Sequence, residues 1–273
     1  MSRYIKLNGV RFSNPNLPIL RDLSAEVAAL PGLMDWFTAA PAYITTDTSG
    51  LVQSWSGRVG GTTFTPALSG KPSFITDAAS GRAAVHFTDS VVMPLTWSGV
   101  FPTGLTETGK FTKILISRLG IAADTNNKFL LGYWNNPTDN DGYHHIRYEP
   151  ALARIGSVVD SSGTTGGGTV DIENPAIINN PSLIGSACDP VAQKNTVMVN
   201  GQVLSATYAA GSAQVDESGL WLGNIGGAGG SVRGPEMNVF DVLVFNADIL
   251  GDVSNAASLE VVRAYAKSRL GIV

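Results

Sequence analysis

Short runs of alternating apolar and polar residues, separated by clusters of glycine, serine and threonine, fill the stretch from Asp35 to Phe87. Alternation with a period of two places successive side chains on opposite faces, which is the pattern of a half-buried strand. Glycine, serine and threonine clusters are typical of turns. This stretch therefore predicts several short strands joined by tight turns, and with them an all-β fold.

Later segments carry the same strand signature. They are Phe111–Ser117, Lys128–Trp134, Thr196–Leu204 and Asn238–Asn246. Within the third, the dipeptide Asn200-Gly201 predicts a type I′ hairpin turn. The fourth is apolar on both faces except for Asp241, which favours a strand buried between two layers.

The last segment changes to a helical period. Leu259, Val262, Tyr265 and Ala266 recur at intervals of three and four residues, so we expect a helix from Asn255 to Arg269. The residues at both ends also favour this helix. Ser254 can serve as the N-cap, Lys267 and Arg269 lie in the last turn, and Gly271 occupies the left-handed C-cap position. One or two helical turns are also expected from Ser24 to Leu30, with Ser24 as N-cap.

Residues 1–29 are expected to form an N-terminal arm, and residues 30–273 a single domain. Proline at positions 15 and 18 interrupts any regular pattern in the arm. The arm nevertheless carries apolar side chains, namely Tyr4, Ile5, Leu7, Val10 and Phe12. Two interpretations stay open: a strand on the edge of the main domain, or an arm that docks onto a neighbouring subunit.

The composition excludes several classes of partner. Charged residues make up 15% of the chain and the net charge is −4, so no basic surface for nucleic acid or anionic membrane is expected. Cys188 is the single cysteine, which rules out an intrachain disulfide and fits a reducing compartment. The first residues lack the apolar core of a signal peptide, and no apolar run reaches the length of a membrane span. We expect a soluble protein that is made in the cytoplasm.

Three blocks of residues resemble a known family. They are Leu30–Trp36 with Asp47–Trp55 and Gly81–Phe87, then Asn200-Gly201 with Leu220–Gly223 and Val239–Phe245, and last Ala264–Ile272. In order and spacing they resemble the concanavalin A-like (laminin G-like) jelly-roll domains found in bacteriophage virion and tail-fibre proteins. The resemblance implies a two-sheet antiparallel jelly-roll sandwich with one short C-terminal helix. It transfers no function, because lectins, glycanases, adhesion modules and structural parts share this fold.

The densest group of aromatic and polar residues surrounds the segment from Tyr133 to His144. Sugar recognition combines aromatic faces with amide and carboxylate partners, so this group is the candidate glycan site: Tyr133, Trp134, Asn136, Asp139, Asp141, Tyr143 and His144. Asp139 and Asp141 also supply oxygens suited to calcium, although the loop lacks the spacing of an EF-hand. No other cofactor is expected. Trp36, Trp55 and Trp221 lie in the family-like blocks and are interpreted as core residues.

Catalytic patterns are weak. A retaining glycosidase needs two carboxylates about 5–5.5 Å apart, whereas Asp216 and Glu217 are adjacent and would point to opposite faces of a strand. The same argument prevents His144 and His145 from sharing a zinc ion on one face. His86 is interpreted as a structural histidine and Cys188 as a buried thiol. We therefore expect no catalytic residues.

These observations lead to one main hypothesis and two alternatives. The main hypothesis is a non-enzymatic virion structural protein of a bacteriophage, which binds other virion proteins through its arm, forms a homo-oligomer (a trimer is the first expectation) and presents loops to a host glycan. The first alternative is a free carbohydrate-binding module. The second is a glycan hydrolase acting through Asp139, Asp141, Asp216 or Glu217.

Overall fold

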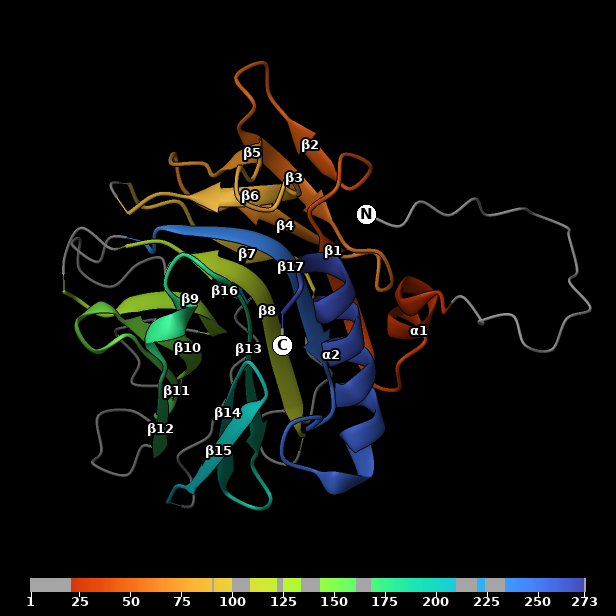
Figure 1. Cartoon of the computed structure of the whole chain (residues 1–273), viewed down its shortest axis with the longest axis vertical. Coiled ribbons are helices and arrows are strands. Elements are labelled where there is room, and N and C mark those ends of the chain that lie inside the picture. Colours follow the sequence, from red (N-terminus) through yellow and green to blue (C-terminus); the bar gives the residue numbers. More distant parts are fainter. Residues whose placement is uncertain are drawn as a thin grey trace, which may run out of the picture.

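The computed structural model describes residues 21–89, 91–99, 109–121, 125–133, 143–160, 168–209, 220–223 and 234–272. Two antiparallel sheets pack face to face, and a long helix covers the outer side of one of them (Figure 1). The predicted fold class, a two-sheet antiparallel sandwich with a C-terminal helix, is confirmed. Its predicted arm lies outside the described residues up to position 20.

Sheet A has eight described strands in the order β15-β14-β13-β8-β17-β6-β5, and β1 pairs with the half of β17 that β6 leaves free. Its strands are β1 Leu33–Thr38, β5 Ser73–Thr76, β6 Ala83–Phe87, β8 Phe111–Leu119, β13 Pro181–Asp189, β14 Lys194–Val199, β15 Gln202–Thr207 and β17 Met237–Phe245. All nine residues of β17 are buried, as expected for a strand between two layers.

Sheet B has nine described strands in the order β12-β11-β10-β9-β16-β7-β4-β3-β2. Its strands are β2 Ile44–Thr46, β3 Val52–Ser56, β4 Thr63–Pro66, β7 Leu95–Trp97, β9 Lys128–Tyr133, β10 Tyr143–Glu149, β11 Arg154–Asp160, β12 Gly168–Glu173 and β16 Trp221–Leu222. In the described ranges, three 3₁₀ turns lie outside the sheets, at Pro150–Leu152, Pro175–Ile177 and Val253–Asn255.

Side-chain alternation along β8 divides the interior into two clusters. Phe111, Leu115 and Leu119 point into the main core between the two sheets. Ile114 and Ile116 point the other way, into a second core between sheet A and the helices. The strand is therefore buried on both faces, and its outermost outward-facing residue, Arg118, is the one that reaches solvent.

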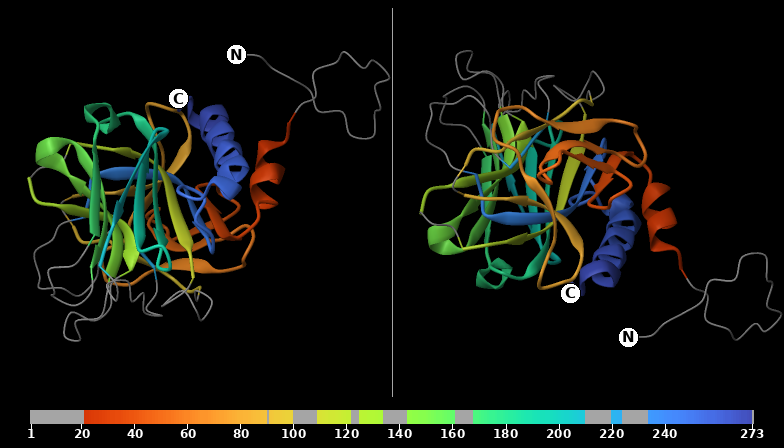
Figure 2. Two further views of the ribbon diagram at one scale, coloured as in Figure 1. Left: turned by 90° about the horizontal axis from the view of Figure 1, so that it is seen from below. Right: turned by 90° about the horizontal axis from the view of Figure 1, so that it is seen from above.

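Helix α2 (Ala256–Leu270) lies along the outer face of sheet A, and α1 (Leu23–Ala28) packs beside it (Figure 2). The predicted apolar face of α2 is confirmed, since Leu259, Val262, Tyr265 and Ala266 are all buried. Gly271 adopts the expected left-handed conformation with φ of 71°. No helix in the described ranges is long and apolar enough to span a membrane.

The two predicted N-caps are wrong. Asp22, rather than Ser24, caps α1 by accepting a hydrogen bond from the amide of Ala25 at 3.2 Å. Helix α2 begins two residues after Ser254, whose amide and hydroxyl both donate to Asp252 in the preceding 3₁₀ turn. Asp22 therefore caps α1, whereas Asn255, at the N-cap position of α2, makes no capping hydrogen bond with its side chain.

A bulge in β17 places a carboxylate between sheet A and α2. The pairing of β17 with β8 shifts register between Val239 and Asp241, so Asp241 joins Phe240 on the helix-facing side. Its Oδ1 accepts hydrogen bonds from Trp36 Nε1 at 3.1 Å and from the Tyr265 hydroxyl at 3.0 Å. Its Oδ2 lies 2.7 Å from Nε of Arg269. Asp241 thereby joins β1, β17 and α2.

Candidate functional site

A polar groove of about 430 Å³ lies at one end of sheet A, on its outer face. Strands β5, β6, β8 and β17 meet there because β17 pairs with β6 on one side and with β8 on the other. Its polar lining includes His86, Arg118, Glu236 and Asn238, with Ile75 and Ile121 as apolar neighbours. We call this the Arg118 groove.

A chain of hydrogen bonds fixes the polar wall of the groove. Asn238 donates its Nδ2 to Oδ1 of the fully buried Asp77 at 2.6 Å, so its own Oδ1 is the acceptor for Nδ1 of His86 at 2.7 Å. The neutral imidazole must then carry its proton on Nδ1, which leaves Nε2 as an acceptor. That nitrogen lies 3.7 Å from Oε1 of Glu236.

The fully buried Asp77 contacts two residues of the groove, Arg118 and Asn238. Its carboxylate accepts from the amide and hydroxyl of Ser80, at 2.8 and 2.7 Å, and it also pairs with Arg118. Burial acts to raise the pKa of Asp77, but the hydrogen bonds from Ser80 and Asn238, with the charge of Arg118, hold it below its usual value. Asp77 is therefore ionised and neutralises Arg118.

The arrangement suits a polar, uncharged ligand. Arg118 is balanced by Asp77, so Glu236 leaves one unmatched negative charge among these groups. Guanidinium, imidazole and carboxylate groups within one groove can donate to and accept from neighbouring hydroxyls. Ile121, which is 72% exposed, and the half-buried Ile75 offer an apolar surface next to them.

A second polar cluster lies inside the sandwich, and it includes a residue predicted to bind sugar. His144 is fully buried, with Nδ1 and its carbonyl oxygen at 2.6 and 2.8 Å from Nζ of Lys113. Its Nε2 lies 3.2–3.3 Å from the hydroxyls of Ser157 and Ser186 and from Oδ1 of Asn195. The Asn195 amide also donates to the carbonyls of Ser157 and Gly168, at 2.8 and 2.9 Å.

This inner cluster is closed to solvent and joins the two sheets. Burial lowers the pKa of Lys113 well below its usual value, and burial with the nearby Lys113 lowers the pKa of His144 in the same way. Its five polar side chains are fully buried, so a substrate cannot reach them. A fully hydrogen-bonded buried network of this kind fixes the register of the sheets rather than binding a ligand.

Among the predicted glycan residues, the structure describes the side chain of His144 alone. His144 points into the core, which excludes it from a surface site in this structure. Tyr133 and Tyr143 lie at the facing ends of β9 and β10, and their side chains are outside the described part. Trp134, Asn136, Asp139 and Asp141 are also outside it, so their role in binding sugar, and that of the two aspartates in binding calcium, stay predictions.

Other predicted residues are described. His145 faces away from His144 and packs edge-on against Phe129, as the alternation argument requires. Trp36 and Trp55 are fully buried, as predicted, while Trp221 is half-buried. Cys188 is a buried thiol, and burial raises its pKa to about 12. Among the described residues, no three histidine, cysteine, aspartate or glutamate side chains gather as a metal site would require.

The sequence did not predict the Arg118 groove. Of its polar residues only His86 was considered, and it was interpreted as structural. Its other polar residues lie far apart along the chain, and each has an ordinary local environment. The one local signal is the turn Asp77–Gly81, in which an aspartate accepts from the serine three residues later.

The known proteins that are similar to this chain share its fold, and the similarity concerns the fold rather than the Arg118 groove in particular. No protein-family model and no curated sequence matches the chain. Among solved structures, Trypanosoma rangeli sialidase is similar with a TM-score of 0.55 and 13% identity, over 86% of this chain and 33% of the sialidase. The binding domain of botulinum neurotoxin serotype D is similar with a TM-score of 0.52 and 7% identity, over 90% of this chain and 52% of that one.

These likenesses correct one prediction. The chain was expected to be non-enzymatic, but the similar structures include sialidases and a sialidase mutant that displays trans-sialidase activity. The fold therefore does not set this chain apart from sialidases, and the prediction of a non-enzymatic chain is wrong. The chain spans a third to about half of the length of these proteins, so the likeness concerns a β-sandwich domain.

Proposed function

We propose that this β-sandwich binds a neutral glycan in the Arg118 groove. The observation that carries the proposal is the hydrogen-bond chain from Asp77 through Asn238 to His86, which holds the polar wall in place without a ligand. Preformed concave sites with a few fixed polar groups are typical of small-ligand binding. The likeness to sialidases and to a toxin's binding domain supports a glycan as the ligand class.

The charge of the groove favours neutral over acidic sugars. Trypanosoma rangeli sialidase has been solved with sialic acid, which carries a carboxylate. In this chain Arg118 is already paired with Asp77, and Glu236 adds a second carboxylate. A sugar carboxylate would meet net negative charge there, whereas sugar hydroxyls can donate to Glu236 and to His86 Nε2.

Replacing Glu236 with alanine is expected to lower the affinity for a neutral glycan at least tenfold, because a hydrogen bond to a charged group contributes about 1.5–3 kcal/mol. Ligands are first found on a glycan array that includes neutral and sialylated sugars. Affinities of the chain and its variants are then measured by titration calorimetry. The exposed Glu173, on β12 of the other sheet, provides the matched control as Glu173→Ala.

Two results would count against this site. Retained affinity in Glu236→Ala would place binding elsewhere, and Trp134→Ala in the same titration tests the loop between β9 and β10. A preference for sialylated over neutral glycans would contradict the charge argument.

We further propose that the domain stands on the surface of a bacteriophage particle and assembles through residues 1–29. The apolar side chains of that segment and the resemblance to virion domains support this setting. Multi-angle light scattering is expected to give a trimer for the whole chain and a monomer after removal of residues 1–20. A monomer for the whole chain, or a trimer that survives the deletion, would contradict assembly through the arm.

A further inference from the structure

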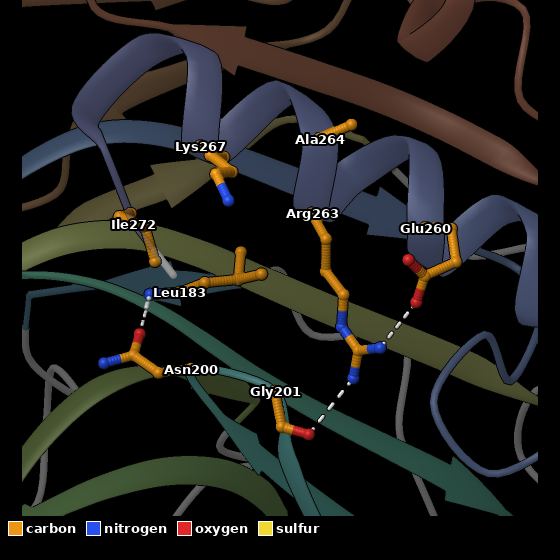
Figure 3. Close-up of a pocket in the computed structure, with 8 residues that line it drawn as sticks. All are labelled: Leu183, Asn200, Gly201, Glu260, Arg263, Ala264, Lys267 and Ile272. Atoms are coloured by element: carbon orange, nitrogen blue, oxygen red, sulfur yellow. Dashed lines mark hydrogen bonds and ion pairs between the residues drawn. The ribbon is translucent and has the colours of Figure 1, made fainter.

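A separate cavity of about 290 Å³ lies between α2 and the β14–β15 hairpin (Figure 3). It is lined by a second face of α2, next to the face that packs on sheet A. Glu260, Arg263 and Lys267 lie on that face because they recur at intervals of three and four residues. The opposite wall is the hairpin turn, where Asn200 and Gly201 have positive φ of 48° and 91°, as the sequence predicts.

The inner part of the cavity is apolar. Leu183, Ala264 and Ile272 line it, and Leu183 and Ile272 are 2% and 8% exposed. The turn beside them is rigid, because Asn200 donates its amide to the carbonyl of Leu183 at 2.9 Å and accepts from the Leu183 amide at 2.8 Å. Two hydrogen bonds therefore fix the turn at this wall of the cavity.

Arg263 lines one side of the cavity and donates two hydrogen bonds within the protein. Its Nη1 donates to Glu260 at 2.6 Å, and its Nη2 donates across the cavity to the carbonyl of Gly201 at 3.1 Å (Figure 3). Nε of Arg263 is buried and has no acceptor among the described residues. Glu260 thus balances the charge of Arg263, and the buried Nε stays without an acceptor among the described residues.

Lys267 has no such balance. No hydrogen bond or ion pair joins its ammonium group to any described residue, and Figure 3 shows the side chain directed toward the space between Leu183 and Ile272. With Arg263 and Glu260 matched, the charged residues that line the cavity leave one net positive charge. An apolar interior beside an unmatched cation is complementary to an amphiphilic anion.

We propose that this cavity binds a small amphiphilic carboxylate, with its hydrocarbon part against Leu183, Ala264 and Ile272 and its carboxylate on Lys267. Because one water-sized group occupies about 30 Å³, the cavity holds a ligand of about ten non-hydrogen atoms. A straight-chain carboxylate of eight carbons has this size. The site is independent of the Arg118 groove and of glycan binding.

Titration calorimetry of the full chain with octanoate, octylammonium and acetate tests the proposal. We expect saturable binding of octanoate alone, since octylammonium has the wrong charge and acetate lacks the apolar body. Lys267→Glu is expected to weaken octanoate binding at least tenfold, and Lys267→Gln to weaken it less. Lys71→Glu, a charge reversal beside Gln53 on β3, is expected to leave it unchanged. Glu236→Ala also retains octanoate binding, which separates this site from the glycan site.

Absence of saturable octanoate binding to the folded chain would overturn the proposal. So would equal binding of octylammonium, or unchanged affinity in both Lys267 variants, since either result removes the cation from recognition. Thermal unfolding of each variant provides the folding control, because Lys267 is exposed and its replacement is not expected to disturb the core.

Discussion

Asp241→Ala is expected to lower the free energy of unfolding by about 3–5 kcal/mol, because removing one partner of a buried ion pair leaves the other charge uncompensated. Asp241 is fully buried, and Arg269 is only 19% exposed at its side chain. The substitution also removes the acceptor of the Trp36 indole and the Tyr265 hydroxyl. Since these groups come from β1 and α2, the loss should weaken the attachment of the helix to sheet A.

The control for this prediction is an exposed ion pair on the same helix. Glu260 is 65% exposed at its side chain where it pairs with Arg263, so Glu260→Ala should cost no more than about 1 kcal/mol. Urea unfolding of both variants, followed by far-ultraviolet circular dichroism, measures the difference. A loss below 1 kcal/mol for Asp241→Ala, equal to that of the control, would show that Asp241 does not hold the helix in place.

The stability of the chain is expected to rise between pH 5 and pH 7, in part because of the inner polar cluster. Burial lowers the pKa of His144 and of His145 well below the usual value of 6.5. The unfolded chain therefore binds protons below pH 6.5 that the folded chain does not, so stability falls as the pH falls. Each histidine contributes up to about 1.4 kcal/mol per pH unit in this window. Lys113 acts in the same direction, since burial lowers its pKa from 10.5.

A variant isolates this effect from other titrating groups. Burial raises the pKa of Asp241 and Asp248, which opposes the trend, so the comparison between variants is more informative than the slope alone. His144→Gln should be less stable at pH 7 and should show a shallower rise from pH 5 to pH 7. Urea unfolding at three pH values measures both. A slope that does not change in the variant would contradict a neutral, buried His144.

Elements that depend on residues close together in the sequence were predicted well. The apolar run around Asp241 predicted a doubly buried strand, the spacing of Leu259, Val262 and Tyr265 predicted the closing helix, and Asn200-Gly201 predicted the hairpin turn. Each depends on residues that are close in sequence. Capping was predicted less well, because neighbouring polar residues can each accept from the free amides of a helix start: Asp22 caps α1, and Asp252 caps the 3₁₀ turn before α2.

The Arg118 groove could not be predicted in this way. Its hydrogen-bond chain joins residues up to 161 positions apart, Asp77 and Asn238, and depends on which strands are neighbours in sheet A. His144 shows the same limit, because its place beside aromatic and polar loop residues favoured a surface role. The alternation of β10 placed it on the inner face instead, where Lys113 from the other sheet meets it.

The central claim is that a neutral glycan occupies the Arg118 groove. The most direct measurement is a backbone amide nuclear magnetic resonance titration with a neutral glycan found on the array. We expect the largest chemical-shift changes at residues on β6, β8 and β17 around His86, Arg118 and Asn238, and none at Gly201 or Lys267. Saturable binding with the largest changes in the loop between β9 and β10, and no change around Asn238, would contradict it.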